Sequence, residues 1–325
     1  MKSNLYPIKF KPILKDKIWG GQKLNSILNK ESTLPNIGES WEISDVDNDI
    51  SIVNNGSLEG QSLKQILNTH KGDLVGAKNY QQFGNKFPLL VKFIDAKEDL
   101  SIQLHPNDEL AKKRHNSFGK TEMWFVMQAD EGANLIVGFN QKVTPQIYLE
   151  HLENKTLTQI LNLDEVGQGD TYFIDVGRVH AIGAGVLLAE IQQTSDITYR
   201  VYDWDRTDDQ GKARELHNDL ALDAIGFEMP NDFRVKYQKD KNISNEMVSC
   251  PYFTTNFLPV TSPVHKVNVY DSFIIYMCVN GKTTIEANGI KTQVSKGETV
   301  LIPAALKNIV IHPKIDSELL EVYIK

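Results

Sequence analysis

This 325-residue sequence is poor in cysteine and lacks long apolar runs and blocks of one charge. Its two cysteines, Cys250 and Cys278, could form at most one bridge, so there is no disulfide framework, and their apolar neighbours predict two buried thiols. No segment has the apolar length of a signal peptide or a membrane span, which predicts a cytoplasmic protein without membrane contact. The net charge of −7 comes without a block of like charges, so nucleic acid is not an expected partner either.

What the sequence does contain is mainly short β-type runs. The hydrophobic content of 41% is enough for a core, and the length suits two fused units or one large sandwich. Turns rich in Gly, Asn and Asp separate the expected strands, which is typical of a sandwich or barrel. The expected strands are 87–96, 123–128, 133–139, 171–176, 186–193, 272–279, 299–304 and 317–324. Helical spacing is found at 62–70, 107–115 and 144–162, and Asn107 is placed as the N-cap of the second helix.

An internal repeat relates the two halves of the chain. The stretch "GDTYFIDVGRVH" begins at Gly169, and "GETVLIPAALKN" begins at Gly297, 128 residues later. Further upstream, Gly132 and Gly281 match at an offset of 149. The difference of 21 residues is about the length of the helical segment near 141–161. The two halves therefore share one pattern, and the first half carries a helical insertion.

The repeated stretch resembles the second motif of the cupin superfamily, whose fold is a small antiparallel jelly-roll barrel. In that motif the last position is a metal-binding histidine, and here it is His180 in the first half but Asn308 in the second. The resemblance implies a mainly β protein with two cupin-type jelly-roll barrels and a helical insertion. Residues 1–240 would form the metal-binding domain, and residues 241–325 a C-terminal domain without metal ligands.

A second motif points to the same metal site. In "SIQLHPND", at positions 101–108, Gln103 and His105 stand two residues apart on an expected strand and project from one face. Such a pair also occurs on ordinary solvated faces. In a cupin barrel, Glu122 and His180 would join the pair on the inner face. Two imidazoles, a carboxylate and an amide oxygen suit Zn²⁺, although they also admit Fe²⁺, Mn²⁺ or Co²⁺.

Three stretches in order, "IQLHP", "GKTEMW" and "VHAIGAGVLLAEIQQTSDITYRVYDWDR", resemble type I mannose-6-phosphate isomerase in its short bacterial form. The resemblance extends to "LKDKIWGG", "GESWEIS" and "FPLLVKFIDA", and so covers most of the chain. That family interconverts mannose 6-phosphate and fructose 6-phosphate with bound zinc. The resemblance implies one Zn²⁺ per chain, a sugar phosphate as the partner, and four metal ligands: Gln103, His105, Glu122 and His180.

The same resemblance assigns Lys120, Glu190 and Arg200 to catalysis, and Lys92 and Ser101 to substrate binding. "HAIGAGVLLAE" is a residue longer than the eukaryotic pattern, and "KTE" replaces the "KPE" of other branches. Without the resemblance, the two lysines would be read as ordinary edge-strand lysines. Arg200 could equally form an ion pair with Asp203 or Asp205, although Arg206 could form that ion pair instead.

Two other functions use the same barrel. A cupin dioxygenase with iron normally shows His-x-His where this chain has Gln103-x-His105, and a non-catalytic sugar-binding module would lose ligands. Aldose–ketose isomerisation moves a proton between C1 and C2 through an enediol and needs neither ATP nor a hydride acceptor. In agreement, the chain has neither a G-x-x-x-x-G-K-[ST] loop nor a G-x-G-x-x-G turn. Trp19, Trp41 and Trp124 are expected in the core, with Trp19 at the pocket mouth, and we expect a monomer or weak homo-oligomer.

Overall fold

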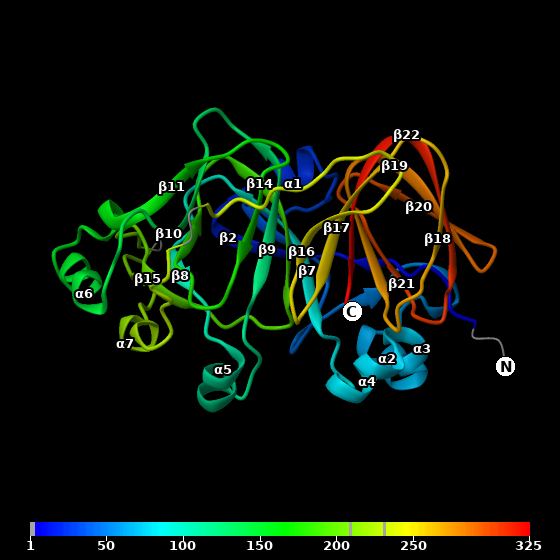
Figure 1. Ribbon diagram of the computed structural model, residues 1–325, viewed down its shortest axis with the longest axis horizontal. Coiled ribbons are helices and arrows are strands. Elements are labelled where there is room, and N and C mark those ends of the chain that lie inside the picture. The colour runs from blue at the N-terminus through cyan, green and yellow to red at the C-terminus, as the bar shows by residue number, and fades with distance from the viewer. Residues whose placement is uncertain (1–3, 208–209, 230–231) are drawn as a thin grey trace.

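The computed structural model describes residues 4–207, 210–229 and 232–325, which form two β units side by side (Figure 1). The first unit contains two antiparallel sheets. The six-stranded sheet has the order β12 (Thr171–Ile174), β9 (Glu122–Ala129), β14 (Val186–Gln193), β7 (Leu89–Ala96), β2 (Ile13–Gly21), β3 (Ile37–Ile43). The five-stranded sheet has the order β11 (Leu161–Glu165), β10 (Asn134–Phe139), β13 (His180–Ile182), β8 (Ile102–Leu104), β15 (Tyr199–Tyr202). Two short pairs flank them: β1 (Phe10–Lys11) with β6 (Ile52–Val53), and β4 (Asp45–Val46) with β5 (Asp49–Ile50).

The second unit is a single seven-stranded antiparallel sheet that bends at two long strands. β19 and β22 pair along most of their length, with bulges near Cys278 and Asn280. A bulge increases the local twist and bends the strand, so each long strand serves two parts of the unit. The strands are β16 (Asn245–Ser249), β17 (Thr254–Val260), β18 (Val264–Val267), β19 (Ile274–Ala287), β20 (Ile290–Ser295), β21 (Thr299–Ile302) and β22 (Asn308–Tyr323). The sequence predicted only one end of β19 and one end of β22.

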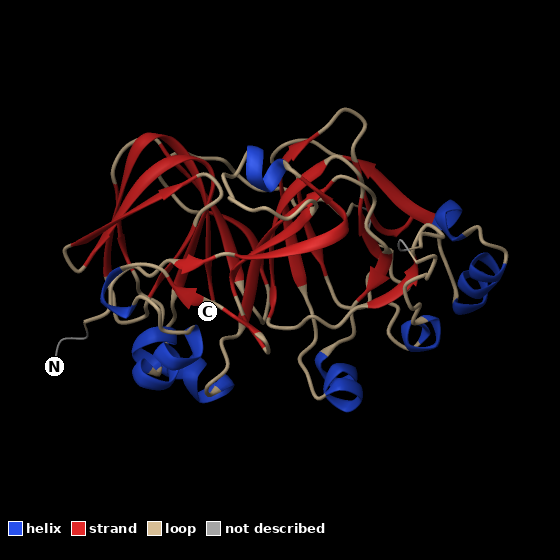
Figure 2. Ribbon diagram, turned by 180° about the vertical axis from the view of Figure 1, so that it is seen from behind, coloured by secondary structure: helices blue, strands red, loops and turns tan. Residues whose placement is uncertain are grey.

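Helices lie at the periphery of both units (Figure 2). They are α1 (Lys23–Ser26), η1 (Gly56–Leu58), α2 (Leu63–His70), α3 (Gly72–Val75), α4 (Ala77–Phe83), α5 (Asp108–His115), α6 (Pro145–Glu153), η2 (Leu157–Ile160) and α7 (Asn218–Leu222). The prediction of α2 is confirmed, and Ser62 and Gln65 form a capping box at its start. The Asn107 side chain caps α5, also as predicted, by accepting a hydrogen bond from the Leu110 N–H.

The single helix predicted over 144–162 is wrong. Helix α6 ends at Glu153, Lys155 adopts a φ of +56°, and the short η2 follows. A lysine in the left-handed region cannot continue a right-handed helix, so the chain turns there. Helical spacing on both sides of this turn makes the sequence read as one element.

The six-stranded sheet is buried on both faces. Val91 and Phe93 on β7 pack into a core that includes Phe273 and Met277 of the second unit. On the opposite face, Ile94 packs with residues of the five-stranded sheet. All eight residues of β7 are therefore buried, which explains why this strand reads as a nearly continuous apolar run.

Segments near the N-terminus contact the second unit. The backbones of Ile8 and Leu301 exchange two hydrogen bonds of 2.8 Å, and the Asp271 carboxylate accepts from the N–H groups of Ala77 and Lys78 at the start of α4. Strands β1 to β15 precede residue 240 and β16 to β22 follow it. The division into 1–240 and 241–325 stays a prediction, because early segments also pack on the later strands.

Both cysteines are free thiols, and Cys278 is buried as predicted. Cys250 is only partly buried, so that part of the prediction is wrong. Within the described ranges, we find no helix with the length and apolar character needed to cross a bilayer.

Candidate metal centre and active-site pocket

The pocket lies between the two sheets of the first unit, where two rows of side chains meet. In the five-stranded sheet, Arg200 on β15 stands opposite Gln103 on β8, which stands opposite His180 on β13. Residues opposite each other on antiparallel strands project to the same face, so these three share one face. The other row crosses β3, β7, β14 and β9 in the order Trp41, Lys92, Glu190, Trp124. All seven side chains line the same pocket.

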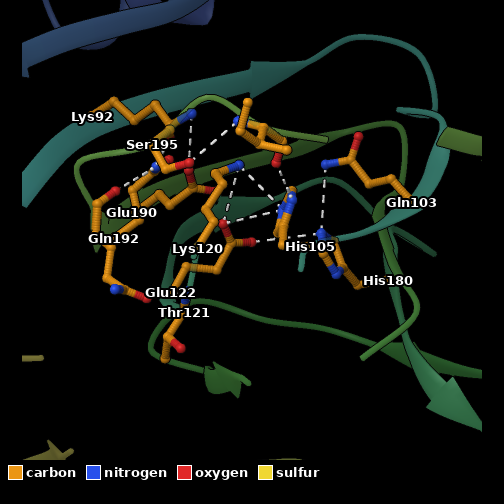
Figure 3. Close-up of polar contacts among 12 residues, drawn as sticks. Lys92, Gln103, His105, Lys120, Thr121, Glu122, His180, Glu190, Gln192 and Ser195 are labelled. Atoms are coloured by element: carbon orange, nitrogen blue, oxygen red, sulfur yellow. Dashed lines mark hydrogen bonds and ion pairs between the residues drawn. The ribbon is translucent and has the colours of Figure 1, made fainter. Parts of the chain in front are cut away.

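At one end of the pocket, three side chains from three strand ends converge (Figure 3). His105 follows β8, Glu122 begins β9 and His180 begins β13. The Nε2 atoms of His105 and His180 lie 3.5 and 3.6 Å from the two carboxylate oxygens of Glu122. All three side chains are buried, and their ligand atoms lie within 4.8 Å of one another. Over 4–207, 210–229 and 232–325, this is the one group of three His, Cys, Asp or Glu side chains that could hold a metal ion.

Backbone carbonyls fix the orientation of both imidazoles. His105 Nδ1 lies 2.8 Å from the carbonyl oxygen of Ile197, and His180 Nδ1 lies 2.8 Å from that of Arg178. A carbonyl can only accept, so each Nδ1 donates and each Nε2 turns its lone pair toward Glu122. Burial lowers the pKa of His180 to about 4 and that of His105 well below its usual range, so both rings are neutral at pH 7.

Glu122 supports the same interpretation. Its Oε2 atom is buried and accepts no hydrogen bond of good geometry, and its nearest partner is the Lys120 ammonium group at 3.3 Å. Burial, followed by repulsion from Glu190, raises the pKa of Glu122 to about 7. Two neutral imidazoles held by carbonyls, next to a buried carboxylate, fit a divalent metal ion.

Gln103 lies beside this cluster with its amide nitrogen toward it. Its Nε2 is 3.4 Å from His180 Nε2, while its Oε1 accepts from the Ser101 hydroxyl at 3.3 Å. A metal would need the oxygen instead, and a half-turn of the amide exchanges the two atoms in place. The position therefore agrees with the predicted ligand set, and the ligand role of Gln103 stays a prediction.

The two lysines are interior residues, so the alternative reading as exposed edge-strand lysines is wrong. Lys120 Nζ lies 3.1 Å from His105 Nε2 and 3.3 Å from Glu122 Oε2. Lys92 Nζ lies 2.9 Å from Glu190 Oε1. The side chains of Lys92 and Lys120 are only 7% and 6% exposed. Both ammonium groups therefore reach the pocket from inside the sandwich.

Lys92 and Glu190 form a charged pair. Burial opposes the charge on each, but attraction to Glu190 and Glu39 outweighs it and raises the pKa of Lys92. In the same way Lys92 and Lys120 overcome burial and lower the pKa of Glu190. The second oxygen of Glu190 accepts a 2.8 Å hydrogen bond from the Trp124 indole N–H. Glu190 is thus held from both neighbouring strands.

Arg200 is not neutralised by the carboxylates near it in sequence. Its Nε donates to the Ser101 hydroxyl at 3.3 Å, and its Nη1 donates to the Glu215 carbonyl at 2.8 Å. Asp203 is bound instead by Arg206 and Arg214. Arg200 forms no ion pair with any residue that the structure describes, which leaves its charge for the pocket.

Several pocket residues were not singled out from the sequence. Trp41 donates its indole N–H to Glu39 at 2.7 Å, and Lys17 lies 3.7 Å from the same carboxylate. The alternation in "GESWEIS" places Glu39 and Trp41 on one face, and this was the available signal. Trp19, Trp41 and Trp124 are buried as predicted and also line the pocket. The remaining polar lining residues missed were Ser195, Asp196, Thr198 and Arg214.

The environment of Glu39 predicts a pH-dependent stability. Burial is outweighed by Lys92 and Lys17, so the pKa of Glu39 falls from 4.5 to about 2. A lowered folded-state pKa contributes stability that is present above pH 4.5 and is lost as the pH falls toward 2. We expect Glu39→Gln to cost on the order of 3 kcal/mol at pH 7 and progressively less below pH 4.5. Urea unfolding at several pH values measures this, and a cost independent of pH would contradict it.

A mainly β fold with a buried His, Glu, His cluster between its sheets is typical of a cupin-type enzyme, and this cluster could hold a metal ion. The chain matches the family "Phosphomannose isomerase type I, catalytic domain" over residues 8–125 and "Mannose-6-phosphate isomerase, cupin domain" over residues 243–317. It is 33% identical over 305 residues to mannose-6-phosphate isomerase ManA of Bacillus subtilis, covering 92% of this chain and 94% of that protein. It is 31% identical over 307 residues to mannose-6-phosphate isomerase of Streptococcus mutans, covering 93% and 94%.

Solved structures agree with these relatives. The mannose 6-phosphate isomerase of Bacillus subtilis superposes with a TM-score of 0.88 at 28% identity, covering 99% of this chain and 100% of that one. A putative mannosephosphate isomerase from Archaeoglobus fulgidus shares the fold, with a TM-score of 0.78 at 21% identity, over 99% of each chain. This chain belongs to the type I mannose-6-phosphate isomerases, a family of isomerase enzymes. The resemblance stated from the sequence, the cupin fold and the enzyme class are confirmed, and membership disfavours both alternative functions.

Proposed function

We propose that this enzyme interconverts D-mannose 6-phosphate, which the names of its relatives contain, and D-fructose 6-phosphate. The observation that carries the proposal is the buried His105, Glu122, His180 cluster at one end of a pocket lined by five basic side chains. The pocket has a cavity volume of about 140 Å³. We also propose a cytoplasmic location and a monomer or weak homo-oligomer.

We infer about one Zn²⁺ per chain, held by His105, Glu122 and His180 with Gln103 as the fourth ligand. When bound, a divalent ion would supply Lewis-acid stabilisation of the negative charge that develops on the sugar oxygens. The Lys120 ammonium group places a positive charge at the same end of the pocket, because it lies between His105 and Glu122.

The other assigned residues act on the sugar. In the forward direction a proton leaves C2 and a proton arrives at C1 through an enediol, so no electron acceptor is consumed. Positioned acid and base groups typically contribute about 10² to 10⁴ in rate to such a step. Glu190 is fixed by Lys92 and Trp124, and Arg200 is fixed by the Glu215 carbonyl, so both groups are oriented before substrate enters.

Lys92 and Ser101 complete the proposed contacts. The Ser101 hydroxyl lies between Gln103 Oε1 and Arg200 Nε, at 3.3 Å from each. It therefore lies beside the two residues that line the pocket from β8 and β15. Hydroxyl and ammonium groups can hold sugar hydroxyls by hydrogen bonds. We assign both residues to substrate binding, with Lys120, Glu190 and Arg200 assigned to catalysis.

The purified, zinc-loaded enzyme should convert mannose 6-phosphate to fructose 6-phosphate and act far more weakly on mannose. The reason is that five basic side chains line the pocket, more than an uncharged sugar requires. Formation of fructose 6-phosphate can be followed by coupling it to glucose-6-phosphate dehydrogenase through phosphoglucose isomerase. No turnover of mannose 6-phosphate, together with oxygen consumption by the iron-loaded protein, would transfer the function to a cupin dioxygenase.

A further inference from the structure

Positive charge in the pocket is compensated unevenly. At the end of the pocket that holds His105, Glu122 and His180, each lysine has a carboxylate partner. Lys92 pairs with Glu190, and Lys120 pairs with Glu122. On the side of β15, Arg206 and Arg214 share one buried carboxylate, Asp203, and Arg206 also lies 3.9 Å from Glu98. Arg200 forms no ion pair within the described residues. Most uncompensated positive charge therefore lies at this second end of the pocket. A phosphate dianion is attracted to uncompensated charge more than to charge already paired.

The guanidinium group of Arg214 is held in a fixed orientation at the β15 side of the pocket. Its Nε donates to Asp203 Oδ2 at 2.7 Å and its Nη2 donates to Asp203 Oδ1 at 2.5 Å. This two-point contact with a carboxylate that is 5% exposed fixes the plane of the group and leaves the Nη1 edge unbound by Asp203. Arg214 lines the pocket, whereas Arg206, which binds the same carboxylate, does not.

Arg200 stands next to Arg214, and their charges repel. After burial, the proximity of Arg214 is the largest cause that lowers the pKa of Arg200. An anion between two such groups relieves this repulsion. Asp196 also lines the pocket, but it is exposed, where water and salt screen its charge.

The spacing along the sheet suits a phosphorylated hexose. Arg200 on β15 is two strands from His180 on β13, with Gln103 on β8 between them. Neighbouring strands lie about 5 Å apart, so the strand of the cluster and the strand of Arg200 are about 10 Å apart. A sugar whose C1 and C2 face the cluster can thus direct its C6 phosphate toward the arginines.

We propose that Arg214, positioned by Asp203, binds the phosphate of the substrate beside Arg200 and determines the preference for phosphorylated sugar. This assignment rests on the proposed function, because it concerns the same pocket and the same substrate. Asp203 is a positioning residue in this arrangement, since it touches Arg214 and not the substrate.

The test compares Arg214→Gln with Arg206→Gln in the zinc-loaded enzyme. Arg214→Gln should raise KM for mannose 6-phosphate roughly 10- to 100-fold with little change in kcat, as expected for a lost charged hydrogen bond. The inhibition constant of inorganic phosphate should rise to a similar extent. Arg206→Gln, which removes a charge from the same carboxylate but lies outside the pocket, should shift neither value more than about two-fold. Arg214→Lys should recover part of the affinity, because it restores the charge without the planar fork.

Unchanged KM and phosphate inhibition in Arg214→Gln would overturn the proposal, and so would equal effects in both glutamine variants. Calorimetric titration with mannose 6-phosphate and with mannose keeps the test independent of turnover. If the wild-type enzyme shows no isomerase activity, the proposed function fails. A preference for the phosphorylated sugar that disappears in Arg214→Gln would still support the phosphate contact.

Discussion

His180→Ala should leave the enzyme without bound metal and reduce isomerase activity to the assay background. His180 supplies one of the two imidazole donors, and alanine offers no donor in its place. Of the proposed ligands His105, Glu122 and Gln103 remain, but the neutral amide oxygen of Gln103 is a much weaker donor to Zn²⁺ than the lost imidazole, so the site should no longer retain the ion. Elemental analysis after gel filtration measures the metal, and the coupled assay measures turnover.

Asn308→Ala is the matched control, because Asn308 occupies in the second half the place of His180 in the first. Asn308 begins β22, stands opposite Val267 and is exposed, so its substitution should change neither metal content nor activity. His105→Ala should repeat the result of His180→Ala. Full metal content in both histidine variants would refute the site. Metal that survives His180→Ala and is lost in Asn308→Ala would assign it to the second unit.

The interior of the second unit supports this distinction. Glu321 is as deeply buried as Glu122, but both of its oxygens are satisfied. Lys266 and Tyr276 contact Oε1, while Ser244 and Asn256 donate to Oε2. Burial is outweighed by Lys266, which lowers the pKa of Glu321, so this carboxylate is charged and fully paired. All the acceptor positions of Glu321 are thus used by protein groups, whereas Glu122 Oε2 has only the Lys120 ammonium group at 3.3 Å and accepts no hydrogen bond of good geometry.

Local pattern found part of the His105, Glu122, His180 cluster, and the family resemblance supplied the rest. Gln103 and His105 share a face because the side-chain period of a strand is two, whereas His180 and Glu122 were assigned through the resemblance of the internal repeat to the cupin motif and barrel. Short, mainly apolar runs also located β7, β9 and β14 closely. These features depend on a few neighbouring residues, which is why they could be read from one sequence.

Features set by contacts between distant strands could not be read in this way. The sequence left the partner of Arg200 open, and the structure resolves it only by bringing Arg214 and Arg206 onto Asp203. Glu39 joins the pocket because β3 pairs with β7, fifty residues later, in one particular register. The lengths of β19 and β22 were underestimated because bulges interrupt the alternation that marks a strand.

Breaking the Lys92 and Glu190 pair should be strongly destabilising, and repairing the charge should restore stability without activity. Lys92→Met leaves the Glu190 carboxylate buried with only the Trp124 N–H as a partner. Loss of one member of a buried pair costs about 3 to 5 kcal/mol of unfolding free energy, because the other charge stays buried. Adding Glu190→Gln removes that charge and keeps an oxygen to accept from Trp124, so most of the loss should be recovered.

Activity should behave differently from stability in this pair of variants. The double variant keeps His105, Glu122 and His180, so its metal content should equal that of the wild type. It lacks both the ammonium group and the carboxylate that we assign to the substrate, so turnover of mannose 6-phosphate should stay near the level of Lys92→Met. Chemical denaturation, elemental analysis and the coupled assay give the three values. A double variant that regains activity together with stability would show that the pair only packs the sandwich and has no part in the chemistry.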